Sequence, residues 1–206
     1  PKKYVSACDK WAPITAGFLT FALLLFAFPP HKAPEMAYIF LVPAIWWLSC
    51  RPSYRSVFST FLFFGWLYYI TLLWWLRHVT FPGLILGSLL LSGYLSVWFL
   101  LARWMIPRVL ESGFRMRLCI MLALSAAWTV IEWIRCQFTL GFPWCPLSVS
   151  QWERPAILQA AEWTGGWGIS FFLVFFNLCV ASYVHHLLVR RRKAEKGWMN
   201  NLCPDF

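Results

Sequence analysis

Charged residues are scarce in this sequence. Lys, Arg, Asp and Glu make up 13% of its 206 residues, and only eight are acidic, whereas a soluble domain has about 25% charged residues. Hydrophobic residues make up 60% of the chain and aromatic residues 20%. The formal net charge of +10 would fit nucleic-acid binding only on a soluble domain with an exposed basic face. The composition excludes nucleic acid as a partner and is typical of an integral membrane protein.

Several enzyme motifs are also missing. The seven cysteines form no C-x-x-C pair, and the chain has no H-E-x-x-H motif, no G-x-S-x-G motif and no phosphate-binding glycine loop. These absences exclude the zinc, thioredoxin-like and hydrolase chemistries that use such motifs. A cysteine nucleophile would need a base and an activating positive neighbour, and no such group can be assembled from these residues. We therefore predict no catalytic residue, no metal site and no cofactor in this chain.

Apolar runs occupy most of the sequence. A helix needs about 20 apolar residues to cross a bilayer, with roughly 17 to 25 tolerated. Six runs are candidates, at residues 14–28, 36–50, 56–76, 84–102, 118–134 and 167–184. The sequence thus predicts an all-α, polytopic membrane bundle of about six transmembrane helices within residues 1–189, followed by a basic cytoplasmic tail at 190–206.

Lys and Arg residues are distributed unevenly between the two predicted sides of the membrane. Fourteen of the 18 lie on the side that holds both termini, and four lie on the other side, at Lys32, Arg77, Arg135 and Arg154. Provided that all six runs are spans, the positive-inside rule places both termini in the cytoplasm. No small-residue cleavage site follows the first run, so we expect it to stay attached. Because the chain begins at Pro1, we interpret it as a fragment or a truncated product.

The stretch IEWIRCQFTLGFPW, residues 131–144, carries charge at the end of a long apolar run. Glu132 and Arg135 are three residues apart, so they share a helix face and can pair. Two interpretations stay open. The pair either reaches the interface and anchors the end of the helix, or shapes a lipid or substrate pocket that faces the outer leaflet.

A proline-rich segment, GFPWCPLSVSQWERP, follows at residues 141–155. Its three prolines forbid a continuous helix, and such backbone is tolerated at membrane depth only inside protein or beside a wet cavity. We therefore expect an ordered loop on the outer side, with Phe142, Trp144 and Trp152 at the level of the lipid headgroups. Cys136 and Cys145 lie on the same side, where they either form a disulfide or fill packing gaps.

Asn177 stands in the middle of the last apolar run. An amide at that depth needs a partner on another helix or a backbone carbonyl. We expect Asn177 to hold helices together and not to take part in catalysis.

Several of these motifs, taken in order, resemble the membrane portion of the bacterial apolipoprotein N-acyltransferases. The matching elements are Glu132-Trp133-x-Arg135, Gly141-Phe142-Pro143-Trp144, Ser150-Gln151, Leu158-Gln159-Ala160 and Gly165-x-x-Gly168-x-Ser170-Phe171. A looser likeness continues back to AFPP after the first run. Two departures from the family pattern are Cys136, where the family usually has glycine, and Ser148-Val149, where it usually has Gly-Tyr.

The resemblance implies a role in lipoprotein biosynthesis at the bacterial cytoplasmic (inner) membrane. Complete relatives move a fatty acyl group from a phospholipid to a cysteine thiolate, and then to the α-amino group of a lipoprotein's N-terminal cysteine. Their Glu-Lys-Cys triad lies on a nitrilase-like domain, with which we expect this chain to work in cis or in trans. By itself the chain should be an inactive part of an acyltransferase. The predicted substrate-binding residues are Glu132, Arg135, Phe142, Trp144 and Gln151.

Two other classes of function stay open. The chain could be a non-catalytic membrane scaffold for a separate catalytic domain, since the same membrane fold is attached to other enzymes. It could also be a small transporter, which would need a file of polar residues through the bundle. The sequence offers only isolated polar residues, which favours the first two interpretations.

Overall fold

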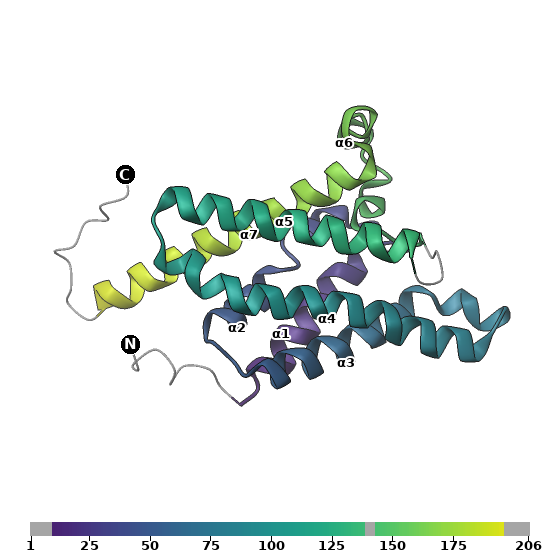
Figure 1. Ribbon diagram of the computed structural model, residues 1–206, viewed down its shortest axis with the longest axis horizontal. Helices are drawn as coiled ribbons and strands as arrows, with labels where there is room; N and C mark the ends of the chain where they lie inside the picture. Colours follow the sequence, from purple (N-terminus) through teal and green to yellow (C-terminus); the bar gives the residue numbers. More distant parts are fainter. Residues whose placement is uncertain (1–9, 139–142, 196–206) are drawn as a thin grey trace.

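The computed structural model describes residues 10–138 and 143–195, which form a bundle of α-helices joined by short 3-10 helices and turns (Figure 1). The elements are α1 (Ala12–Phe26), η2 (Pro34–Tyr38), α2 (Val42–Ser49), α3 (Tyr54–Leu72), η3 (Trp74–His78), α4 (Phe81–Glu111), α5 (Phe114–Gln137), η4 (Leu147–Gln151), α6 (Pro155–Leu158) and α7 (Ala161–Glu195). No strand occurs within these two ranges. The prediction of an all-α bundle is confirmed.

Three helices are long and apolar enough to cross a membrane, over Phe81–Val109 in α4, Phe114–Gln137 in α5 and Ala161–Leu187 in α7. A shorter apolar helix, α1, adds Ala12–Phe26. Helix α3 has 19 residues, or roughly 28 Å at 1.5 Å per residue, and covers most of the predicted run 56–76. The chain is a polytopic membrane protein, and the count of six spans stays a prediction.

The predicted span at residues 36–50 is wrong as a single helix. Its residues divide between η2 and the eight-residue α2, which is about 12 Å long and too short for a hydrocarbon core of about 30 Å. The run is apolar because the protein interior buries it: Phe40, Leu41, Ala44 and Leu48 have no exposed surface. Apolarity therefore reflects packing against other helices here, and not contact with lipid.

The helix is interrupted between η2 and α2, and Asn177 of α7 forms hydrogen bonds with the backbone at this point. Its Oδ1 accepts from the Leu41 N–H at 2.9 Å, and its Nδ2 donates to the Ala37 carbonyl at 2.7 Å and to the Leu173 carbonyl at 2.8 Å. Buried backbone groups are almost always paired, and between η2 and α2 the partner is a side chain from the other end of the sequence. The prediction that Asn177 holds helices together is confirmed.

Helices α3 and α4 approach each other closely. The rings of Phe61 and Phe99 stack with centroids 3.5 Å apart, and the Ser92 hydroxyl donates to the Leu62 carbonyl at 2.6 Å. A Cβ on Gly65 would lie 2.6 Å from Ser92 Oγ, so a larger residue at position 65 would separate the two helices.

Figure 1 shows α4 and α5 side by side along the long axis of the molecule. The α4–α5 connection and the C-terminal part of α7 lie at the left end, and the α3–α4 connection and the end of α5 lie at the right. Helix α7 bends at Gly165 (φ 64°, ψ −178°) and continues to Glu195, beyond the predicted boundary at residue 189. The division into a membrane part and a tail stays a prediction, and residues 196–206 lie outside the described ranges.

Candidate substrate-binding site

Glu132 holds the start of η4 from the last turns of α5. The Leu147 N–H donates to Glu132 Oε1 at 2.7 Å, and only 5% of Glu132 is exposed. The Leu147 N–H is one of the groups at the start of η4 that have no partner inside the helix, where a carboxylate is favoured. Glu132 thus fixes where η4 begins.

Arg135 holds the backbone at Trp144, three residues before Leu147. Its Nη1 donates to the Trp144 carbonyl at 3.1 Å, and 4% of the residue is exposed. Glu132 and Arg135 form no ion pair with each other, although their spacing allows one. The interpretation as a pair that reaches the interface is wrong, because both groups turn inward to the backbone of the segment that follows α5.

Gln151 holds the other end of η4, and Ser170 holds its second residue, Ser148. Gln151 is fully buried; its Nε2 donates to the Pro34 carbonyl at 3.1 Å, and its Oε1 accepts from the Tyr38 hydroxyl at 3.2 Å. The Ser148 N–H donates to Ser170 Oγ of α7 at 3.0 Å. We call residues 143–154 the η4 loop. Its backbone and side chains are bound by three separate elements, α5, α7 and η2, so the loop is ordered, as the sequence predicts.

Two ion pairs link the end of the η4 loop to Lys32, just before η2, and to Glu35 within η2. Lys32 Nζ lies 3.3 Å from Glu153 Oε1, and the Arg154 guanidinium pairs with the Glu35 carboxylate. The hydrogen bond from Arg154 lowers the pKa of Glu35 from its ordinary value of 4.5. Such exposed pairs contribute little to stability, so the buried contacts of Gln151 matter more for holding the loop.

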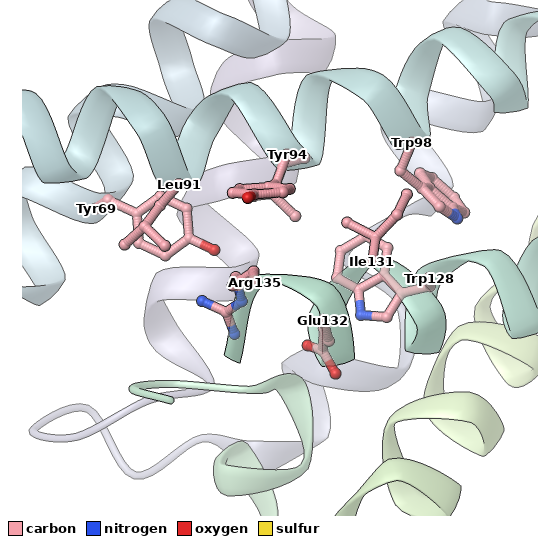
Figure 2. A pocket seen from close by; sticks show the side chains of 9 residues that line it. Tyr69, Leu91, Tyr94, Trp98, Trp128, Ile131, Glu132 and Arg135 are labelled. Atoms are coloured by element: carbon pink, nitrogen blue, oxygen red, sulfur yellow. The ribbon is translucent and has the colours of Figure 1, made fainter. Parts of the chain in front are cut away.

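A small cavity, with about 10 Å³ of space for the centres of water-sized spheres, lies beside this loop among α3, α4 and α5. Its lining is mostly aromatic and aliphatic, with Glu132 and Arg135 as its charged members (Figure 2). The complete set is Tyr69, Leu91, Tyr94, Leu95, Trp98, Trp128, Ile131, Glu132 and Arg135. An apolar lining with a few polar groups is usual in small-molecule sites, but drug-sized ligands take about 300–1,000 Å³, whereas this cavity has the size of about one water molecule.

The predicted substrate-binding residues take different positions. Glu132 and Arg135 line the cavity together, whereas Gln151 is an internal anchor of the η4 loop. Trp144 is 50% exposed, and its ring centroid lies 5.0 Å from that of Trp75. Phe142 lies outside the described residues. Binding of substrate by any of the five stays a prediction.

Sequence reasoning did not select Tyr38, Trp128 or Ser170 for this site. Ser170 stands in an apolar stretch of α7, and a hydroxyl at that depth is a usable signal. Trp128 lies four residues before Glu132 and so shares its helix face. Nothing near Tyr38 in the sequence indicates Gln151 as its partner, because 113 positions separate them.

Cys136 and Cys145 are free thiols in the structure, which supports the packing interpretation over the disulfide. Burial raises the pKa of the Cys145 thiol above its ordinary value of 9.0, the opposite of what activates a nucleophile. Among the described residues, no group of three or more His, Cys, Asp or Glu side chains could hold a metal ion. The hydrogen bonds of this region hold the η4 loop in place.

Comparison with known proteins gives a consistent result. A family model described as the apolipoprotein N-acyltransferase N-terminal domain matches residues 22–179. The apolipoprotein N-acyltransferase of Chlorobaculum tepidum is 31% identical over 171 residues, which are 82% of this chain and 31% of the relative. The protein of the same name from Geobacter metallireducens is 24% identical over 180 residues, 84% of this chain and 33% of the relative. The chain spans about a third of the length of these two curated relatives. No solved structure matches it.

Proposed function

Since the chain belongs to the apolipoprotein N-acyltransferase N-terminal domain family, we propose that it serves the transfer of a fatty acyl group from a phospholipid to the N-terminal cysteine of a lipoprotein. The observation that carries the proposal is the extent of the match. Residues 22–179 include the cavity, the η4 loop and all the side chains that hold this loop. The region that the family model matches thus includes the buried polar contacts that hold the η4 loop.

The role of this chain in the reaction is to position lipid and not to form bonds. Two-step acyl transfer needs two lipidated substrates to reach one nucleophile in turn. Glu132 Oε1 and Arg135 Nη1 are bonded to the backbone of the residues that follow α5, so they act on substrate by fixing this segment. Its exposed Trp144 then faces the lipid. The nucleophile belongs to a nitrilase-like domain that works with this chain in cis or in trans.

The proposal includes a location and an orientation. The chain lies in the bacterial cytoplasmic (inner) membrane with both termini in the cytoplasm and the η4 loop outside. Support comes from the α4–α5 connection and the C-terminal part of α7, which lie at one end of the bundle (Figure 1) and carry Arg103, Arg108, Arg115, Arg117 and the run Arg190 to Lys193. A single cysteine placed at Val149, which is exposed, in a variant without other cysteines should react with a membrane-impermeant maleimide in intact spheroplasts. Reaction only after the membrane is permeabilised would contradict this orientation.

A chimeric enzyme tests the function. The N-terminal third of the Chlorobaculum tepidum relative is replaced by this chain, and the chimera is expressed in cells depleted of their own N-acyltransferase. We expect N-acylated lipoprotein, detected by mass spectrometry of its N-terminal peptide. The 206-residue chain alone should give no acylation. In the chimera, Trp144→Ala should raise KM for the lipid substrate with little change in kcat, because the ring faces the lipid and not the reacting atoms.

A matched chimera that carries the N-terminal third of the Geobacter metallireducens relative is the control for the junction. If this control acylates lipoprotein and the chimera with this chain does not, at equal membrane levels, the proposal is wrong. Acylation by the 206-residue chain alone would contradict the assignment of the nucleophile to another domain.

A further inference from the structure

Two buried polar atoms face the cavity described above without a hydrogen-bond partner among the described residues. They are Glu132 Oε2 and Trp128 Nε1. Glu132 uses only its other oxygen, Oε1, to accept from the Leu147 N–H. Burying polar groups without a partner is unfavourable, and in folded proteins such groups usually share an ordered water.

The two atoms belong to one site. Trp128 and Glu132 are four residues apart on α5, hence on the same helix face, and both line the cavity. Figure 2 shows the indole nitrogen of Trp128 on the side of its ring that faces the Glu132 carboxylate. An indole N–H can only donate, and a carboxylate oxygen accepts. A molecule between them must therefore accept one hydrogen bond and donate another, which a water or a hydroxyl does.

We propose that Trp128 Nε1 and Glu132 Oε2 together bind one long-lived water molecule, which joins the core of the bundle to the residue that fixes the η4 loop. The cavity leaves about 10 Å³ for the centres of water-sized spheres, which is close to the roughly 10–15 Å³ that one water needs, so it holds one water and no larger molecule. The lining also includes the polar side chains of Tyr69, Tyr94 and Arg135, but of the lining groups only the Trp128 N–H and Glu132 Oε2 are buried without a partner among the described residues. This site does not depend on the proposed acyl transfer and can be tested without any substrate.

The neighbouring Trp98 provides an internal control. It lines the same cavity, and its ring centroid lies 5.1 Å from that of Trp128. Its indole N–H, however, donates directly to the Leu124 carbonyl at 2.9 Å. Two buried indoles in contact thus differ in one respect, namely whether the partner of the N–H is protein or water.

The experiment is nuclear magnetic resonance on the full chain, with ¹⁵N-labelled tryptophan indoles, in nanodiscs of deuterated lipid. We expect a cross-relaxation peak between the Trp128 indole proton and water, with the sign of a long-lived complex, and no such peak for Trp98. The Trp128→Phe and Trp98→Phe variants assign the two signals. If Trp128→Phe does not fold, contact with Phe40, whose ring centroid is 5.8 Å away, assigns Trp128 in the unchanged chain.

A second variant tests the other side of the bridge. Glu132→Gln keeps an oxygen for the Leu147 N–H but places an amide where Oε2 was, so it should move the Trp128 indole signal and leave that of Trp98 in place. Three results would overturn the proposal: no water peak for Trp128, peaks of equal strength for both indoles, or a Trp128 signal that Glu132→Gln does not move. In a second sample with protonated lipid, a peak between the Trp128 indole and lipid in place of water would overturn it as well.

Discussion

Replacing Asn177 by leucine is expected to destabilise the bundle strongly. The substitution nearly preserves volume but leaves the Leu41 N–H and the Ala37 carbonyl without the partner that Asn177 provides at 2.9 and 2.7 Å. An orphaned buried group costs about 1–3 kcal/mol, or about 2–6 for both. Hydrogen bonds between membrane helices contribute about 0.6–1.7 kcal/mol each, or about 1–3 for both. The two ranges overlap at about 2–3 kcal/mol, which is the loss we expect.

The free energy of unfolding can be measured by titrating the protein in mixed micelles with SDS and following tryptophan fluorescence. Thr129→Val is the matched control. Its hydroxyl, also in a membrane helix, donates to the Ser125 carbonyl of its own helix at 3.2 Å, so its removal leaves no buried N–H unpaired. We expect a loss under about 0.5 kcal/mol for this control, in the range of ordinary substitutions.

The result that would refute the reasoning is a loss for Asn177→Leu no larger than for Thr129→Val. It would mean that the backbone between η2 and α2 is satisfied without α7. A hydrogen-exchange measurement on the Leu41 amide distinguishes the two cases, because protection that survives the substitution identifies another acceptor for this N–H.

Three further predictions concern single residues. Gly165→Ala is expected to lower the free energy of unfolding by about 1–3 kcal/mol, because its φ of 64° and ψ of −178° suit essentially only glycine. In the same SDS titration Gly93→Ala should not destabilise, since its added Cβ meets no atom within 4 Å, and equal losses would contradict the argument. The Glu35 carboxyl, followed by carbon-13 resonance, is expected to titrate below 4.5 because its hydrogen bond with Arg154 lowers its pKa. The stability from this contact is therefore present above pH 4.5 and is lost as the pH falls through the lowered pKa; Arg154→Gln should return the midpoint toward 4.5, and an unchanged midpoint would refute the assignment to Arg154. As the only cysteine left, Cys145 should react with iodoacetamide more slowly at pH 8 than after unfolding in SDS, because burial raises its pKa; equal rates would show that the folded chain does not bury this thiol.

The positions of the long helices could be predicted from the sequence because apolar runs of sufficient length have few alternatives in a membrane. The predicted runs 84–102 and 118–134 lie within α4 and α5. The run 36–50 is an exception, because it does not form a single membrane-spanning helix. Residues that are apolar because other helices surround them look like residues that face lipid, so hydropathy alone does not separate α2 from a span.

The roles of Glu132 and Arg135 could be predicted only in part. Their position at the end of α5 and their importance for the following loop follow from the sequence. Their partners do not, because these are the Leu147 N–H and the Trp144 carbonyl, and any residue carries such backbone groups. Helix spacing indicates which side chains can meet each other. It does not indicate that the backbone of the following loop competes for the same side chains, because the conformation of this loop cannot be read from the sequence.

The contacts of Asn177 also set an order of assembly during synthesis. The Leu41 N–H is translated 136 residues before the side chain that accepts its hydrogen bond. At about 5–20 residues per second, Asn177 follows on the order of ten seconds later. In that interval the η2–α2 segment, whose residues the finished bundle buries, has neither the length to span the bilayer alone nor its partner. The η2–α2 segment thus leaves the ribosome well before the side chain that completes its hydrogen bonds, and it reaches its final position only when α7 enters the membrane.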